Sequence, residues 1–200
     1  SVGGGVRSEK EVDKLLRIGV DKIVVNSAAV KNPNFLKSLV DIYGASTISV
    51  NIETAQLNGK YEVFTETGRV NTGINLYDWI EKVQKLNVGE IIVTDIFAEG
   101  KNKGFNTNLF KQIRKSVDTQ LVAHGGAGPK ENILEMFEEC NVDAISIASL
   151  LHYHYLKSNK STELKGSNYF IHFLNDDEKR GMSILELKKY LKLSGVKVRL

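Results

Sequence analysis

The amino-acid sequence predicts an α/β fold in which parallel strands alternate with helices along one chain. Short runs rich in Ile and Val recur with about 20 to 40 residues between their starts, which is the length of one strand-plus-helix unit. Amphipathic stretches separate these runs, and glycines or polar residues follow each of them. This alternation is typical of parallel strands joined by right-handed crossovers.

The predicted strands begin with the segment VGGG at the start of the chain, which we take as the end of a first strand. Each later strand is predicted from a run that is apolar on successive residues, as in a strand buried on both faces. These runs are Lys22–Asn26, Ser46–Ile52, Glu90–Asp95, Gln120–His124 and Asp143–Ile147.

Helices are predicted in the amphipathic stretches between the strands. In one of them Trp79, Ile80 and Val83 form an apolar stripe beside polar neighbours, the pattern of a helix with one buried side. The predicted helices are Glu9–Ile18, Asn34–Tyr43, Leu76–Leu86, Asn108–Ser116 and Lys130–Glu139.

The turns after the strands separate two candidate architectures. A closed parallel barrel needs eight strand–helix units, whereas an open doubly wound sheet tolerates six. Here the strand ends read GGGVRS, NSAAVKNP, IETAQLNG, TDIFAEGKNKG, HGGAGPKEN and IASLLH, so small and polar residues gather at the carboxyl ends of the strands. That edge carries the active site in TIM barrels, so these turns favour a barrel of which about six units are present, and the open sheet stays as the alternative.

Length and composition narrow the function. The chain of 200 residues fits one domain, residues 1–200, and its net charge of +3 comes from scattered side chains. This favours a small-molecule or protein partner over nucleic acid. Cys140 is the single cysteine, so no disulfide forms within the chain, and no apolar run reaches transmembrane length. We expect a cytoplasmic protein with no membrane partner.

Two glycine turns predict phosphate binding. GGG near the start of the chain and GGAG after Gln120–His124 both precede a predicted helix. Exposed backbone N–H groups beside a helix N-terminus form an anion site, and the absence of side chains lets a phosphate approach. Neither turn matches the dinucleotide fingerprint, and no P-loop lysine follows, so nucleoside triphosphate chemistry is not expected. Two such turns imply a ligand with two phosphates, or two ligands.

These motifs together resemble a known family. The strings GGGVRS, DKIVVNSAAVKNP, GKYEVFTETGRVNTG, GEIIVTD, AHGGAG, IAS and GVKVRL occur in this order, and the chain is similar to the cyclase subunit of imidazole glycerol phosphate synthase. The resemblance implies an incomplete TIM (β/α)8-type barrel of about six units, strands 3 to 8, with two phosphate sites and with GGG at the end of the third strand. It further implies that strands 1 and 2 are absent from this sequence, and that residues 155–181 are an insertion before the last helix.

The resemblance also implies an activity in histidine biosynthesis. In this family a glutaminase partner releases ammonia, which travels through the barrel to a ribulosyl ribonucleotide. The cyclase closes an imidazole ring and splits off an aminoimidazole carboxamide nucleotide, with no metal and no organic cofactor. Two carboxylates act as general acid and base, since one must donate a proton as the other accepts one. We therefore expect a heterodimer with a glutaminase and a phosphorylated ribonucleotide as substrate.

The family's site residues carry over position by position. Glu53 matches the catalytic aspartate of strand 5 and keeps its carboxylate on a side chain longer by one CH2 group. The other catalytic aspartate, on strand 1, lies outside this sequence. The positions expected to contact substrate or phosphate are Gly4, Gly5, Asn26, Ser27, Thr94, Gly100, His124, Gly125, Gly126, Ala148 and Ser149.

Two positions depart from the family. Where it typically has a D-R-D-G turn after strand 6, this chain has Phe97, Ala98, Glu99 and Gly100. The residue before GGAG, usually small and hydroxylic, is His124. It is interpreted either as a residue that binds phosphate or carries a proton, or as an ordinary structural histidine. An apolar Phe97 at this edge either packs under a loop or reshapes the site for another substrate.

The opposite end of the predicted barrel keeps the family's features. Lys22 and Glu90 match charged residues of a salt-bridged ammonia gate, and Asp21 matches a position that faces the glutaminase. The alternative is that these residues are ordinary surface charges beside the strands.

Two other functions stay open. One is a paralogue that conducts glutamine-derived ammonia to a sugar-amidating enzyme in surface polysaccharide biosynthesis, because the gate is retained while the site is altered. The other is an inactive barrel that serves only as a docking surface. His152, His154 and His172 do not have the spacing of a strong metal motif, so no metal site is expected.

Overall fold

The computed structural model describes residues 1–158 and 181–199 of the chain. Most of the predicted insertion 155–181 and His172 lie outside the described residues. The helices are α1 Glu9–Arg17, α2 Ser27–Lys31, α3 Pro33–Tyr43, α4 Leu76–Lys85, α5 Thr107–Arg114, α6 Lys130–Glu138, α7 Ser149–Ser158 and α8 Ile184–Leu193, with a 3-10 turn at Ala45–Thr47. The strands are β1 Val2–Gly3, β2 Ile23–Val25, β3 Ile48–Leu57, β4 Lys60–Thr65, β5 Val70–Asn75, β6 Glu90–Asp95, β7 Gln120–His124 and β8 Ala144–Ile145.

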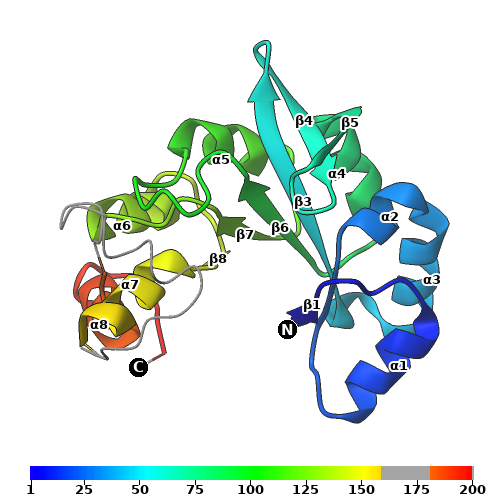
Figure 1. The fold of residues 1–200 in the computed structure, drawn as a ribbon, viewed down its shortest axis with the longest axis horizontal. Coiled ribbons are helices and arrows are strands. Elements are labelled where there is room, and N and C mark those ends of the chain that lie inside the picture. Colours follow the sequence, from blue (N-terminus) through cyan, green and yellow to red (C-terminus); the bar gives the residue numbers. More distant parts are fainter. Residues whose placement is uncertain (159–180, 200) are drawn as a thin grey trace.

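Six parallel strands form one curved sheet in the order β1-β2-β3-β6-β7-β8. The order follows the sequence, as it does in a (β/α)-barrel, and the helices lie on one side of the arc (Figure 1). Among the described residues β1 and β8 do not pair with each other, so the barrel is open. The prediction of an incomplete TIM-type barrel is confirmed.

The two faces of the central strand β3 differ in polarity. Ile48, Val50 and Ile52 are fully buried and belong to the apolar core that the sheet shares with the helices. Asn51 and Glu53, which alternate with them, line a cavity on the inner side of the arc. The strand was predicted to be apolar on both faces, but the period-two alternation of strand side chains gives it a polar inner face.

A β-hairpin that the sequence reading missed follows this strand. The segment IETAQLNG was interpreted as a turn, but β3 continues to Leu57 and pairs antiparallel with β4, which pairs in turn with β5. Asn58 and Gly59 form the first turn with φ values of 50° and 79°. Positive φ at both central residues is the signature of the Asn-Gly hairpin turn, so this dipeptide was the available signal.

The five predicted helices agree with the structure to within about two residues, and three more are present in the described ranges: α2, α7 and α8, of which α8 is the last helix that the resemblance implied. The short helix α2 begins immediately after Asn26 and was expected to be a turn. Helix α7 begins at Ser149, so the LLH part of the last predicted turn is helical. Both helices start at the carboxyl end of a strand, where their first N–H groups are free of intrahelical partners.

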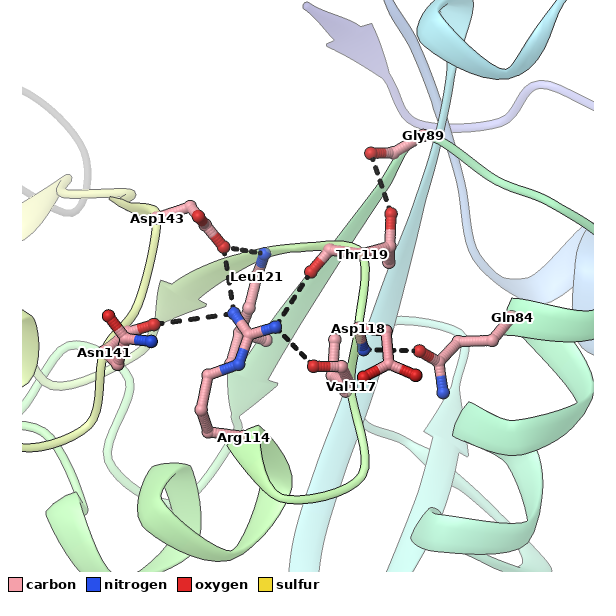
Figure 2. Close-up of polar contacts among 9 residues, drawn as sticks. All are labelled: Gln84, Gly89, Arg114, Val117, Asp118, Thr119, Leu121, Asn141 and Asp143. Atoms are coloured by element: carbon pink, nitrogen blue, oxygen red, sulfur yellow. Dashed lines mark hydrogen bonds and ion pairs between the residues drawn. The ribbon is translucent and has the colours of Figure 1, made fainter.

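A polar network joins the amino ends of three neighbouring strands (Figure 2). The Arg114 guanidinium donates to the carbonyl oxygens of Val117, Thr119 (3.2 Å) and Asn141 (3.4 Å) and to Asp143 Oδ2 (3.0 Å). The same Asp143 oxygen accepts from the N–H of Leu121 at 2.8 Å.

The network continues towards β6 through the loop before β7. Thr119 Oγ1 donates to the carbonyl of Gly89 at 3.1 Å, and the N–H of Asp118 donates to Gln84 Oε1 at 2.7 Å. These contacts fix the loops that lead into β6, β7 and β8. We call this end of the barrel, formed by the amino ends of the strands, the floor, and the carboxyl end the rim.

Candidate functional site

A cavity of about 690 Å³ opens at the rim on the inner side of the sheet. A smaller cavity of about 90 Å³ lies beside it, and His124 and Ser146 line both. Of the residues expected from sequence, the larger cavity is lined by Gly4, Gly5, Asn26, Ser27, Glu53 and His124. The smaller cavity is lined by Gly100, His124, Gly125, Gly126, Ala148 and Ser149. The structure therefore brings together eleven of the twelve expected rim residues, whereas the buried Thr94 lines neither cavity.

The β4–β5 hairpin fixes the carboxylate of Glu53. The backbone N–H of Gly68, at the hairpin tip, donates to Glu53 Oε2 at 2.9 Å. The tip is held in turn by the Glu66 N–H, which donates to Ser27 Oγ at 3.0 Å, and by an ion pair between Lys31 and Glu66 at 2.5 Å. The hydrogen bond from Lys31 lowers the pKa of the exposed Glu66 carboxyl below its usual range. A hydrogen-bonded carboxylate in a cavity is able to accept a proton at its second oxygen.

Asn26 presents an unpaired polar atom at the site. Its side-chain Oδ1 is buried and has no hydrogen-bond partner among residues 1–158 and 181–199. A buried oxygen without a donor costs about 1–3 kcal/mol, so such atoms are rare unless a ligand supplies the hydrogen bond. Asn26 also immediately precedes α2, whose first residues Ser27 and Ala28 line the same cavity.

The glycines of the opening turn are suited to close approach by a ligand. Gly4 and Gly5 have φ values of 99° and 76°, a region that other residues rarely adopt. A Cβ added to either would meet nothing within 4 Å, so the space beside them is open cavity rather than packed protein.

In the second turn, glycine is needed for a different reason, which is close packing against other backbone. A Cβ on Gly125 would lie 2.5 Å from the carbonyl oxygen of Asp95, and one on Gly126 would lie 2.5 Å from that of Gly104. These glycines let the turn pack against the loop after β6, and their missing side chains face that loop rather than open space. The predicted approach of a phosphate to this turn therefore depends on the backbone N–H groups that line the smaller cavity.

Thr94 links the expected residue His124 to one that sequence reasoning missed. Its hydroxyl lies 2.9 Å from Asn51 Oδ1 and 3.0 Å from His124 Nδ1, and the residue is 2% exposed. Asn51 lines the larger cavity. The alternation of inner and outer residues along β3 was the signal that pointed to it.

The turn after β6 is built on Asp95, a buried residue that was not expected at the site. Asp95 Oδ1 accepts from the N–H groups of Phe97 at 3.0 Å and Ala98 at 3.2 Å, which closes an Asx turn. Phe97 is 51% exposed, so it does not pack under a loop. Glu99 lines the smaller cavity together with Gly100.

Two arginines that sequence reasoning did not single out also line the larger cavity. Arg7 follows the opening glycine turn, and Arg69 follows the hairpin tip. Both line the same cavity as Gly4 and Gly5, so two positively charged residues border a space that suits an anionic group.

The floor holds the expected charged pair. Lys22 Nζ lies 2.7 Å from Glu90 Oε2, and Ser49 Oγ donates to Glu90 Oε1 at 2.7 Å. The Lys22 side chain is 31% exposed and that of Glu90 is 13% exposed. Asp21 is exposed beside them. The pair lies at the opposite end of the sheet from the rim cavity, as the sequence predicted for these two positions.

Among the described ranges, no group of three or more His, Cys, Asp or Glu side chains is placed to hold a metal ion. Within the same ranges no helix is both long and apolar enough to cross a lipid bilayer.

The fold and the rim cavity define a class. Parallel strands in sequential order, polar side chains and glycine turns at their carboxyl ends, and a cavity at that rim are the features of (β/α)-barrel proteins, whose sites lie at this end of the strands. A family model described as "Histidine biosynthesis protein" matches residues 1–157. The chain belongs to this histidine biosynthesis family.

One curated relative is the imidazole glycerol phosphate synthase subunit HisF of Bacillus cereus (strain Q1). It is 39% identical over 154 residues, which cover 76% of this chain and 61% of the relative. The chain thus spans about three fifths of the length of the relative that it matches. The expected resemblance to the cyclase family is confirmed.

Proposed function

We propose that this chain is part of an ammonia-dependent cyclase of the imidazole glycerol phosphate synthase type, which acts with a glutaminase in histidine biosynthesis. The observation that carries the proposal is the placement of Glu53. Its carboxylate is fixed by the Gly68 N–H inside a cavity whose edge is formed by the open glycines Gly4 and Gly5. A general acid–base group and an anion-binding edge therefore face one ligand.

The chemistry follows from these groups. A phosphate of the ribonucleotide binds at the opening glycine turn, where Arg7 balances its charge, and Asn26 Oδ1 accepts a hydrogen bond from the ligand. Glu53 transfers a proton as ammonia adds and the imidazole ring closes. The glycine turn after β7 and the start of α7 bind the second phosphate at the smaller cavity.

Ammonia enters from the floor in this proposal. The Lys22–Glu90 ion pair forms part of the gate, and Asp21 faces the glutaminase. Because Glu90 is mostly buried and holds two donors, its position is well defined, as a gate between the partner and the cavity requires.

The test uses the protein made from its complete coding sequence, with the ribulosyl ribonucleotide and ammonium as substrates. Release of the aminoimidazole carboxamide nucleotide is followed, and Glu53→Gln is compared with Glu138→Gln, an exposed carboxylate on α6. We expect Glu53→Gln to lower kcat by about 100-fold or more and Glu138→Gln to leave it unchanged. If Glu53→Gln turns over the ribonucleotide as fast as the wild-type protein does, Glu53 takes no part in the mechanism.

Phe97 favours a second candidate, a paralogue that conducts ammonia to a sugar-amidating enzyme in surface polysaccharide biosynthesis. An exposed aromatic ring at the rim, where the family typically places charged residues, suits contact with another protein better than contact with a phosphate. Glutaminase binding without turnover of the ribonucleotide by wild-type protein would favour this candidate. Turnover by wild-type protein would exclude it as the sole function.

A further inference from the structure

His124 is the one residue with an ionisable side chain that lines both rim cavities. It is the last residue of β7, and its ring contacts Thr94 through Nδ1 at 3.0 Å. Nδ1 makes the only hydrogen bond that the ring forms with the described residues. Nε2 has no partner among them, and it is not one of the buried atoms that lack one. The Nε2 edge is therefore open to the cavities.

The hydrogen bonds behind His124 define which ring nitrogen carries a proton. Thr94 has one hydroxyl proton, and Asn51 Oδ1 only accepts, so Thr94 donates to Asn51. The contact between Thr94 and His124 then has the opposite direction, with Nδ1–H donating to the Thr94 oxygen. The neutral ring consequently has its lone pair on Nε2, on the cavity side.

This arrangement persists when the ring gains a proton. An imidazolium donates through both nitrogens, so Nδ1–H keeps its bond to Thr94 while Nε2 is protonated. Thr94 is 2% exposed, so water does not compete for this contact. The ring is thus held in place in both protonation states, as proton transfer requires.

His124 also lies near Glu53, two strands away on the same face of the sheet. Glu53 of β3 pairs with Thr94 of β6, and Thr94 pairs with His124 of β7. The two side chains thus lie at one level of the barrel, two strands apart, which is roughly 10 Å between Cα atoms at the usual strand spacing. Both line the larger cavity, so one ligand there is within reach of both groups.

We propose that His124 is a second proton-transfer residue of the rim site, held as the Nδ1–H tautomer by Thr94 and Asn51. This proposal deepens the proposed function and rests on it for the reaction. When ammonia adds to a carbonyl carbon of the ligand, its lone pair forms the C–N bond, the π electrons of the C=O bond move to the oxygen, and the adduct nitrogen is cationic. Nε2 forms a bond to one of its protons, the N–H electrons stay on the ligand nitrogen, and the ring becomes imidazolium. The imidazolium returns that proton to the nitrogen of the aminoimidazole carboxamide nucleotide, which leaves with the electrons of its own C–N bond to the rest of the ligand.

The tautomer is tested without any assay of activity. The chain has four histidines, and in protein labelled with ¹⁵N-histidine the His124 signals are assigned by their loss in His124→Gln. We expect a protonated Nδ1 and an unprotonated Nε2 in the neutral ring. Thr94→Ser keeps the hydroxyl and should keep this state, whereas Thr94→Val should shift the ring towards the Nε2–H tautomer. An Nε2–H tautomer in the wild type, or no difference between the two variants, would overturn the proposal.

Kinetics then separate proton transfer from phosphate binding. We expect His124→Gln to lower kcat by about 100-fold with KM changed by less than about threefold. A rise in KM with kcat retained would instead make His124 a phosphate ligand and overturn the proposal. If wild-type protein does not turn over the ribonucleotide, the proposed function fails, and the ¹⁵N comparison alone decides whether His124 is held for proton transfer.

Discussion

The Arg114 side chain should contribute more to the free energy of unfolding than any other single polar side chain at the floor. The guanidinium contacts three backbone carbonyls and one carboxylate, and these belong to the two loops that lead into β7 and β8 (Figure 2). Its side chain is only 20% exposed. Replacement by methionine keeps the aliphatic stem but removes every donor, so the carbonyls of Val117 and Thr119 lose their partner.

The magnitude follows from the type of each contact. A hydrogen bond from a charged donor contributes about 1.5–3 kcal/mol, and such contributions are not additive within one side chain. The ion pair with Asp143, which is 48% exposed, adds about 0.5 kcal/mol. Because one contact is long at 3.4 Å, we expect the free energy of unfolding to fall by about 3 kcal/mol in Arg114→Met. Arg114→Lys keeps one donor group and should lose about half as much.

Equilibrium unfolding in urea measures this loss. With a denaturant dependence of about 2 kcal/mol/M, a loss of about 3 kcal/mol lowers the midpoint by about 1.5 M. The matched control is Lys115→Met, the next residue, which is exposed and should change the midpoint by less than about 0.3 M. Equal midpoints for Arg114→Met and Lys115→Met would refute the reasoning and make the network incidental.

Three further outcomes are expected. Gly68→Ala should destabilise the hairpin tip by about 1 kcal/mol and lower kcat, because its φ is 74° and its N–H holds the carboxylate in the cavity. Gly73→Ala, with a similar φ of 69°, is the control. Equally fast hydrogen exchange of the hairpin-tip amides in both variants would contradict a specific role of Gly68. Burial, followed by a hydrogen bond to an aspartate, raises the pKa of Tyr43 to about 12 from 10.0. The folded state therefore holds this proton more tightly, so the stabilisation is complete below pH 10 and is lost towards pH 12, and Tyr43→Phe should flatten the alkaline fall of the urea midpoint. Lys22→Met and Glu90→Gln should show a coupling of about 1 kcal/mol in a double-mutant cycle, and additive losses would mean that the floor ion pair does not stabilise the fold.

The sequence was sufficient to predict the strands of the parallel core, because the residues that form apolar runs in the sequence are also the ones that the sheet buries. Ile91 and Val93 in β6 and Leu121 and Ala123 in β7 are fully buried, and each lies in a run predicted as a strand. The hairpin was missed because Glu53 and its neighbours were interpreted as a turn after a barrel strand. The strand β3 continues past the last residue that pairs with its parallel neighbour β6, and beyond that point it pairs only with β4, in antiparallel orientation.

The site was predictable as a set of strand ends, but its contacts were not. Each of Asn26, Glu53 and His124 follows or ends an apolar run, so their convergence on one rim follows from parallel topology alone. The bond between Thr94 and His124 depends on the register of β6 with β7, and a one-residue slip would turn one of the side chains to the outer face. No local signal in a single chain sets that register.

The two ends of the barrel differ in whether their polar side-chain atoms have hydrogen-bond partners within the chain. At the floor, Glu90 receives donors on both carboxylate oxygens, and Arg114 uses both terminal nitrogens. At the rim, Asn26 Oδ1 has no partner among the described residues, and His124 Nε2 is turned to open space. An unpaired buried polar atom lowers stability by an amount comparable to a lost hydrogen bond, so folding alone gives no reason to keep one. The floor is therefore built for a fixed arrangement of strands, whereas the rim holds donors and acceptors whose partners belong to a ligand.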